Sequence, residues 1–309
     1  MGRRLFEHSE PQVSGASWRP DEAAPPAPGD LVPGSVTLCR MPRFAANLSF
    51  LYQELPFLER FDAAARDGFA GVECLFPYDV PAVELRARAD ASGVSIVLIN
   101  APPGDWSAGE RGLASLEGRD EDFRESIERA LAYALTVAAP RVHVLAGVLR
   151  AEDERDAAIA RYEERLHWAA MQAARSGIDL MIEPINPHDM PGYLLQRQDE
   201  AHAIVERVGA SNLKVQMDLY HCGRVEGDVV AQVRRHLSSG RVGHFQIAGV
   251  PDRHEPDDGT LDWRGALAAI DEIAVTTGWE GWIGCEYRPR DATSGGTSRG
   301  IRRWQNSKD

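Results

Sequence analysis

The sequence predicts a (β/α)8 TIM barrel, a single α/β domain in which eight parallel strands alternate with helices. Three observations support this fold. From residue 41 onward, short apolar runs of strand length alternate with longer runs of helical periodicity. Eight such units fit the length that remains after the first forty residues. Polar residues stand at the C-terminal ends of several strands, where barrels of this kind carry their sites.

The expected strands are short and apolar, and amphipathic segments separate them. The strands are expected at residues 43–48, 71–76, 94–99, 142–145, 178–182, 213–218, 242–246 and 282–286. The helices are expected at 56–66, 81–91, 120–137, 154–175, 200–208, 229–237 and 263–276. The last helix is expected to be weak, because 292–298 is loop-like and only 301–304 offers apolar anchors. A doubly wound open sheet is the alternative, but it would want a glycine-rich phosphate turn, and the sequence has no GxGxxG or GxxxxGK[ST].

Residues 1–40 differ in composition from the rest, being rich in Pro, Gly, Ala, Ser and charge. Such a segment buries too little apolar surface to offset its ordering entropy, so we expect a disordered extension. Met41 opens the patterned region, residues 41–309, and an upstream assignment of the start codon is a second explanation. Determining the N-terminal mass of the native protein tests this hypothesis, which an intact residue 1 would exclude.

Composition excludes several classes of partner. The formal net charge of −13 argues against nucleic acid and anionic membrane surfaces, which require a basic face. No apolar run approaches the length of a membrane span. The four cysteines are far apart and form no CxxC pair, which is typical of reduced thiols in a cytoplasmic protein rather than of a zinc motif or a disulfide framework.

Four polar residues end the last four expected strands: Glu183, Asp218, Gln246 and Glu286. A barrel brings such strand ends to one side of its mouth. Their oxygen atoms are the ligands that Mg²⁺ or Mn²⁺ prefers, and four of them leave about two positions for water or substrate oxygens. We therefore expect a divalent metal site here; the alternative is four ordinary strand-end polar residues.

Further polar residues follow these strand ends. His221 lies three residues after Asp218, His188 lies in the loop after Glu183, and Arg253 lies in the loop after Gln246. We expect these three, with Asn100 at the end of the third strand, to bind the substrate. Arginine suits a carboxylate because its planar fork can bond both oxygens.

Three other polar residues are assigned to structure, and one loop to the mouth of the barrel. His143 and His244 lie inside strands and are interpreted as packing residues, and Lys214 is expected at the base of its strand. The loop after the third strand contains Trp106 among prolines and glycines. Such a loop is shaped and semi-rigid, so Trp106 could exclude water from a small site.

From about residue 41 to 304 the chain resembles the hydroxypyruvate isomerase family of xylose-isomerase-like TIM barrels. The matching stretches are RFAANLS (43–49), PGDW (103–106), AGERG (108–112), IEPIN (182–186), QMDLYH (216–221), HFQIA (244–248) and GCEY (284–287). The resemblance implies an isomerase domain at 41–309 that interconverts hydroxypyruvate and 2-hydroxy-3-oxopropanoate (tartronate semialdehyde). It also implies that Glu183 and Glu286 transfer the proton through an enediolate beside a metal. Some family members carry histidine where this chain has Ile99, and related sugar epimerases carry histidine where it has Gln246.

Several alternatives stay open at this stage. Related members isomerise 2-oxo-tetronates, and ketose 3-epimerases use the same metal and paired glutamates on longer sugars. A sugar-acid-binding protein on a catalytically silent barrel is the non-enzymatic alternative. A DNA repair nuclease of the same fold is disfavoured by the acidic charge and by the lack of a multi-histidine cluster. Whether the chain forms a homo-oligomer does not follow from the sequence.

Overall fold

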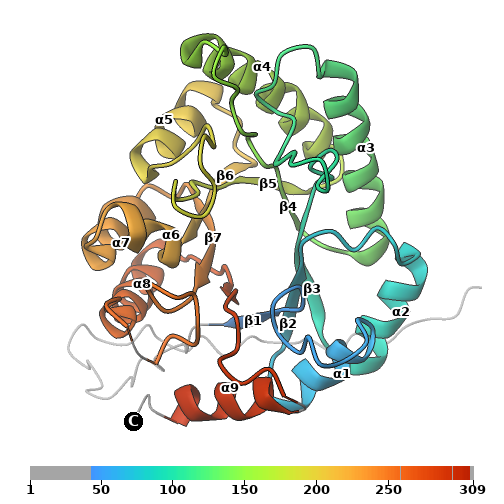
Figure 1. Cartoon of the computed structure of the whole chain (residues 1–309), viewed down its shortest axis with the longest axis vertical. Helices are drawn as coiled ribbons and strands as arrows, with labels where there is room; N and C mark the ends of the chain where they lie inside the picture. Colours follow the sequence, from blue (N-terminus) through green and yellow to red (C-terminus); the bar gives the residue numbers. More distant parts are fainter. Residues whose placement is uncertain (1–42, 258, 294, 307–309) are drawn as a thin grey trace, which may run out of the picture. The chain divides into compact units, whose positions relative to one another are not determined.

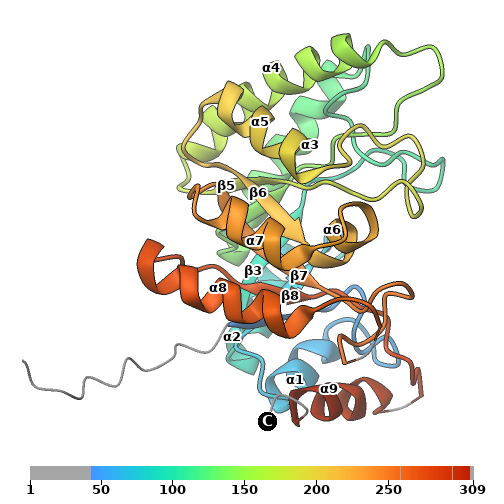
Figure 2. The same cartoon turned by 90° about the vertical axis from the view of Figure 1, so that its left-hand side faces the viewer.

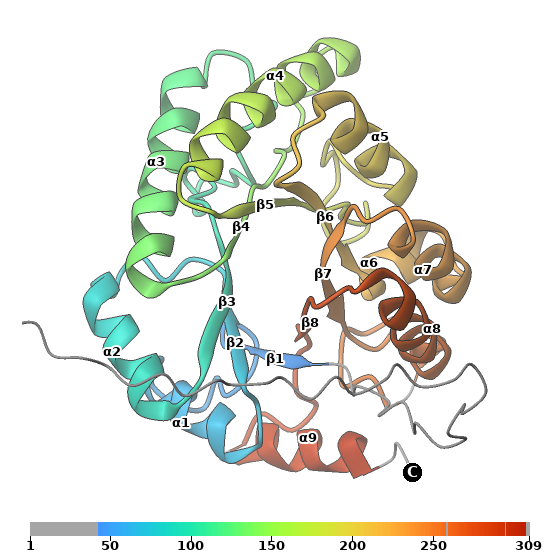
Figure 3. The same ribbon diagram turned by 180° about the vertical axis from the view of Figure 1, so that it is seen from behind.

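The computed structural model of the chain describes residues 43–257, 259–293 and 295–306. The predictions for residues 1–40 lie outside them. Within this part the barrel prediction is confirmed, because eight parallel strands close in sequence order, from β1 beside β2 round to β8 beside β1 (Figures 1 and 3). In Figure 3 the helices surround this ring of strands. None of the helices described is long and apolar enough to cross a membrane.

The strands are close to those expected, each differing by at most a few residues at its ends. They are β1 (Phe44–Asn47), β2 (Gly71–Cys74), β3 (Ser95–Asn100), β4 (Arg141–His143), β5 (Asp179–Ile182), β6 (Leu213–Asp218), β7 (Val242–Ile247) and β8 (Ile283–Cys285). The helices are α1 (Glu59–Arg66), α2 (Ala82–Ser92), α3 (Asp120–Val137), α4 (Arg155–Ala174), α5 (Gln198–Val208), α6 (Leu219–Val225), α7 (Val229–Leu237), α8 (Trp263–Thr277) and α9 (Gly296–Asn306).

Two helices differ from expectation. The short helix α6 was not predicted; it begins where the side chain of Asp218 accepts a hydrogen bond from the backbone N–H of Tyr220. The last helix, α9 (Gly296–Asn306), begins inside the segment 292–298 that was expected to be loop-like, and it lies beside α1 (Figures 1 and 2). Ile301 of α9 is fully buried, and Thr297 accepts a hydrogen bond from the backbone N–H of Tyr52. Contacts distant in sequence therefore stabilise a segment whose local composition resembles a loop.

Strand register places the functional residues at one level of the barrel. Asp218 of β6 is paired with Gln246 of β7, and Gln246 is paired with Gly284 of β8. The long loops after β3, β4 and β5 and the helix α6 lie at the same end of the barrel (Figure 2). That end is the C-terminal end of the strands, where parallel barrels carry their sites.

Candidate active site

A cavity of about 500 Å³ lies at this end of the barrel. Its lining includes most of the site residues expected from the sequence: Asn100, Glu183, His221, Gln246, Arg253 and Glu286. Asp218 does not line the cavity but is fully buried and contacts His221 and Arg253, which do. A cavity of this size is large enough for a small sugar acid and several waters.

The structure does not bring His188 into this cavity. Its side chain is exposed, and its backbone N–H donates to Oδ1 of Asn186. The backbone N–H of Asp189 donates to the same oxygen, so the buried Asn186 side chain turns the loop outward after Pro187. Asn186 points inward instead, and its side chain contacts His221.

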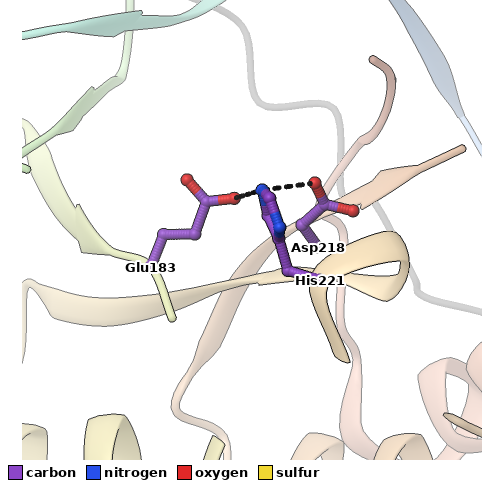
Figure 4. A group of neighbouring side chains, drawn as sticks. All are labelled: Glu183, Asp218 and His221. Carbon is purple, nitrogen blue, oxygen red and sulfur yellow. Dashed lines mark ion pairs between the residues drawn. The ribbon is translucent and has the colours of Figure 1, made fainter. Parts of the chain in front are cut away.

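His221 lies between two carboxylates, those of Glu183 and Asp218 (Figure 4). Its Nε2 is 4.0 Å from Glu183 Oε1 and 3.6 Å from Asp218 Oδ2. Burial, with the nearby Arg253 guanidinium second, lowers the pKa of His221 well below its ordinary value, so the ring is neutral.

The hydrogen-bond network assigns the tautomer of the His221 ring. Nδ1 lies 3.4 Å from the backbone nitrogen of Asn186 and 2.6 Å from its side-chain Nδ2. Oδ1 of this amide accepts the two backbone N–H groups of the outward turn, which fixes Nδ2 toward the histidine. Because both neighbours of Nδ1 are donors, Nδ1 accepts and the ring hydrogen is on Nε2. His221 therefore presents an N–H donor to the space beside Glu183 and Asp218.

Arg253 is surrounded by acids. Its Nη2 is 2.9 Å from Glu286 Oε1 and 3.4 Å from Asp218 Oδ2, and its Nη1 is 3.7 Å from Asp189 Oδ2. The rings of Phe50 and Tyr220 each lie 4.9 Å from its Cζ. The guanidinium thus balances part of the negative charge at the strand ends.

The acids of the site are strongly perturbed. Burial, followed by the charges of Glu286 and Asp218, raises the pKa of Glu183 well above its ordinary value. Burial likewise raises the pKa of Glu286 to about 8 and that of Asp218 to about 6, although Arg253 lowers both. Three buried acids share one guanidinium, so without a further cation their raised pKa values favour the binding of protons.

This donor set fits a cation. One ligand atom from each of Glu183, Asp218 and His221 lies within 4.8 Å of the others. Glu183 Oε1 is buried and has no hydrogen-bond partner among the described residues. Since Nε2 of His221 carries a hydrogen, the carboxylate oxygens are the better ligands, and they suit a hard divalent cation. The chain therefore has an acidic cluster that can hold a metal ion.

A further carboxylate in the lining of the cavity, that of Glu73 of β2, was not identified from the sequence. One of its oxygens accepts hydrogen bonds from Nδ2 of Asn47 at 2.9 Å and Nε2 of Gln246 at 2.7 Å. Its other oxygen is 2.7 Å from Nε2 of His244. A Cβ added to Gly284 would lie 2.4 Å from both carboxylate oxygens, so glycine makes room for Glu73. The sequence feature that could have identified this residue is a glutamate inside an otherwise apolar strand.

His143 and His244, interpreted as packing residues, are both buried, and the structure adds polar neighbours to that interpretation. His143 lines the cavity, and its Nε2 is 3.6 Å from Glu183 Oε2. Nε2 of His244 donates a hydrogen bond to the buried Glu73 carboxylate. Burial lowers the pKa of His143 to about 3, so that ring is neutral beside Glu183. Strand alternation points both side chains into the barrel, which short apolar runs do not reveal.

Comparison with known proteins places the chain in a family. A family model described as Xylose isomerase-like TIM barrel matches residues 61–307. A 2-oxo-tetronate isomerase of Cupriavidus necator is 56% identical, over 83% of this chain and 96% of that protein. The hydroxypyruvate isomerase of Escherichia coli is 38% identical, over 83% of this chain and 97% of that protein.

Solved structures agree with this placement. A Brucella melitensis protein described as AP endonuclease, family 2 is 42% identical, with a TM-score of 0.80 over 87% of this chain and 100% of that chain. A D-psicose 3-epimerase of Clostridium cellulolyticum is 17% identical with a TM-score of 0.72, over 86% of this chain and 98% of that chain, and shares the fold. The chain belongs to the xylose isomerase-like TIM barrel family, and it is an isomerase.

Proposed function

We propose that this isomerase moves a carbonyl group between C2 and C3 of a short 2-oxo acid. The observation that carries the proposal is that two buried glutamates, Glu183 and Glu286, follow different strands and line one cavity. Such a pair can remove a proton from one carbon and return a proton to its neighbour. The formal net charge of −13 gives no support to a nucleic-acid substrate.

Two substrates fit this chemistry. Hydroxypyruvate and 2-oxo-tetronates share a carboxylate, a carbonyl at C2 and a hydroxyl at C3, and they differ in the substituent on C3. Hydroxypyruvate is the substrate expected from the family resemblance of the sequence. The 56% identity to a 2-oxo-tetronate isomerase, against 38% to a hydroxypyruvate isomerase, favours a 2-oxo-tetronate as the physiological substrate. Hydroxypyruvate is the second candidate.

In the proposed mechanism, one glutamate takes a proton from C3. The electron pair of that C–H bond forms a C2–C3 double bond, and the C2 oxygen becomes negative, giving an enediolate. A proton is then added at C2, and the hydroxyl proton of the C3 oxygen passes to the C2 oxygen, which leaves a hydroxyl at C2 and completes the aldehyde or ketone at C3. Glu183 and Glu286 are the donor and acceptor for the carbon-bound protons. The order in which they act is left open.

Other residues stabilise the charge that develops. The Nε2–H of His221 is a donor for a substrate oxygen, and Asn100 lines the same cavity. Mg²⁺ or Mn²⁺, held by Glu183, Asp218, Gln246 and Glu286, would supply Lewis-acid stabilisation of both substrate oxygens. Glu73 holds the Gln246 amide nitrogen, and the amide oxygen, turned away from Glu73, accepts a hydrogen bond from Nε2 of Gln216 at 2.8 Å, so binding of a cation there would have to compete with or share this contact.

Proton exchange in heavy water tests the proposal. We expect deuterium to enter C2 of the product and C3 of the remaining substrate. NMR measures this exchange with hydroxypyruvate and with a 2-oxo-tetronate as substrate, each with and without Mg²⁺. Glu286→Gln should lower turnover by roughly 10²–10⁴-fold, the range for a lost acid–base group, with an unchanged circular dichroism spectrum. Near-normal turnover by this variant would exclude the two-glutamate mechanism. Exchange only at C3 of longer ketoses would instead identify a 3-epimerase.

A further inference from the structure

The substrate proposed above is an anion, and the cavity contains several carboxylates. A carboxylate entering beside Glu183 and Glu286 is repelled unless a cation faces it. Arg253, which the sequence analysis expected to hold the substrate carboxylate, already has ion pairs with Glu286, Asp218 and Asp189. Its capacity to bind a further carboxylate through two parallel hydrogen bonds is therefore reduced.

Two further arginines line the same cavity: Arg111, and Arg288, whose side chain is exposed. Arg111 lies on the loop between β3 and α3, with its Cζ 3.8 Å from the centroid of the Trp106 ring. The Trp106 ring packs in turn on Phe76, 5.3 Å away between centroids, and both aromatic residues line the cavity. Stacking on an aromatic face orients a guanidinium and leaves its edge free for hydrogen bonds.

The hydrogen bonds of Arg111 leave part of this edge available. Nη1 donates to the backbone oxygens of Trp106, at 2.9 Å, and Glu110, at 2.8 Å. In the part of the chain that the structure describes, Arg111 has no ion pair with a carboxylate, whereas Arg253 has three. Nε and Nη2 are the donors that remain, and one carboxylate can bind both of them.

The loop is tied down on both sides of Arg111. Glu110 forms an ion pair with Arg119 and accepts a hydrogen bond from the backbone N–H of Asp105 at 2.6 Å. Gly112 has a φ of +117°, and a Cβ there would lie 2.4 Å from the backbone oxygen of Leu145. Only glycine permits this close approach, which fixes the chain directly after Arg111. The arginine is thus held in place before any ligand binds, which reduces the entropy lost on binding.

We propose that Arg111, stacked on Trp106, binds the carboxylate of the substrate and makes this barrel select 2-oxo acids over neutral ketoses. The inference rests on the proposed function, because it names the group that recognises the acid. Arg253 then has a different task, which is to balance the charge of Glu286 and Asp218. The carboxylate at Arg111 and the reacting carbons at the glutamates would lie in one cavity.

The test compares ligands that differ only in the carboxylate. Pyruvate and hydroxyacetone are competitive-inhibitor probes in which a carboxylate is replaced by a hydroxymethyl group. For Arg111→Gln we expect kcat/KM for the acid that the wild type turns over to fall by roughly 10²–10³-fold, mainly through KM, as two charge-assisted hydrogen bonds are lost. The inhibition constant of pyruvate should rise by a similar factor, and that of hydroxyacetone should change by less than about threefold. Arg111→Lys should recover part of the loss.

The matched control is Arg124→Gln, which removes an exposed arginine stacked on Trp168, 4.5 Å from its ring centroid, outside the cavity. It should leave all three constants unchanged. Thermal unfolding of each variant reports whether it folds. If Arg111→Gln weakened the binding of pyruvate and hydroxyacetone equally, or left kcat/KM unchanged, the role of Arg111 would be overturned while the proposed function stood. A wild type that turns over neither hydroxypyruvate nor a 2-oxo-tetronate would overturn the proposed function, and the assignment of Arg111 with it.

Discussion

The tautomer of His221 can be reversed by changing one buried neighbour, Asn186. In the wild type both the backbone N–H and the side-chain amide of Asn186 donate to Nδ1. In Asn186→Asp one carboxylate oxygen still accepts the backbone N–H groups of His188 and Asp189. The other oxygen replaces the donor at 2.6 Å from Nδ1, and we expect a proton on Nδ1 in this variant.

The contacts set the size of this effect. In the wild type, a hydrogen on Nδ1 would face two buried donors and leave both without an acceptor, which costs about 1–3 kcal/mol for each donor. The Nε2–H tautomer is then favoured by at least about 2 kcal/mol, or about 30-fold. In Asn186→Asp one of these donors is lost, and a charge-assisted hydrogen bond worth about 1.5–3 kcal/mol favours hydrogen on Nδ1. The remaining backbone N–H lies 3.4 Å from Nδ1, a long hydrogen bond, so we expect the carboxylate to outweigh it.

Two-bond ¹H–¹⁵N correlation NMR on protein with ¹⁵N-labelled histidine distinguishes protonated from unprotonated ring nitrogens. Comparison with a His221→Gln sample assigns the signals of this ring among the nine histidines. We expect Nδ1 to be unprotonated in the wild type and in Asn186→Leu, which keeps the backbone donor, and protonated in Asn186→Asp. Adding Mg²⁺ should leave the hydrogen on Nε2. A hydrogen on Nδ1 of the metal-free wild type would refute the assigned tautomer. Its appearance on Nδ1 only after Mg²⁺ is added would instead identify His221 as a metal ligand.

Three further predictions follow from other buried groups. Glu73→Gln removes a charged acceptor shared by three donors and should lower the free energy of unfolding by about 2–4 kcal/mol, seen as a lower Tm; a Tm equal to that of the wild type would contradict the network. Asp218→Asn should weaken Mn²⁺ binding in a titration followed by electron paramagnetic resonance, and unchanged affinity would remove it from the ligand set. Burial lowers the pKa of His202 from 6.5 to about 3, so its contribution to stability is complete above pH 6.5 and declines as the pH falls toward 3. Between pH 8 and pH 5 the free energy of unfolding should fall by about 2 kcal/mol more in the wild type than in His202→Gln, as measured by chemical denaturation. An equal fall in both proteins would count against this role of His202.

The strands and the residues at their ends could be predicted because their signals are local. Apolar runs bounded by glycine and proline mark buried strands, and a carboxylate such as Glu183 at the end of such a run is conspicuous. Parallel topology then brings the ends together without further information. This is why Glu183, Gln246 and Glu286 were all expected where they line the cavity.

Residues whose role depends on tertiary contacts were not found in the same way. Glu73 interacts with β1 and β7, and its hydrogen-bond partner His244 lies 171 positions away in sequence. Helix α6 follows from the capping side chain of Asp218, a residue already assigned to the metal. His188 was selected as a loop histidine, but Asn186 is the residue that the turn directs inward. Periodicity records which face is apolar, not which polar partners meet there.

The two buried carboxylates Glu73 and Glu183 have opposite hydrogen-bond environments, and this contrast separates their functions. Glu73 has hydrogen-bond partners on both oxygens, so its charge is stabilised without any ligand. Glu183 has an oxygen without a hydrogen-bond partner among the described residues and two other acids that raise its pKa. A buried charge without partners is costly, so this oxygen favours whatever cation or proton enters the cavity. The satisfied carboxylate holds Gln246 in place, and the unsatisfied one is left free to react.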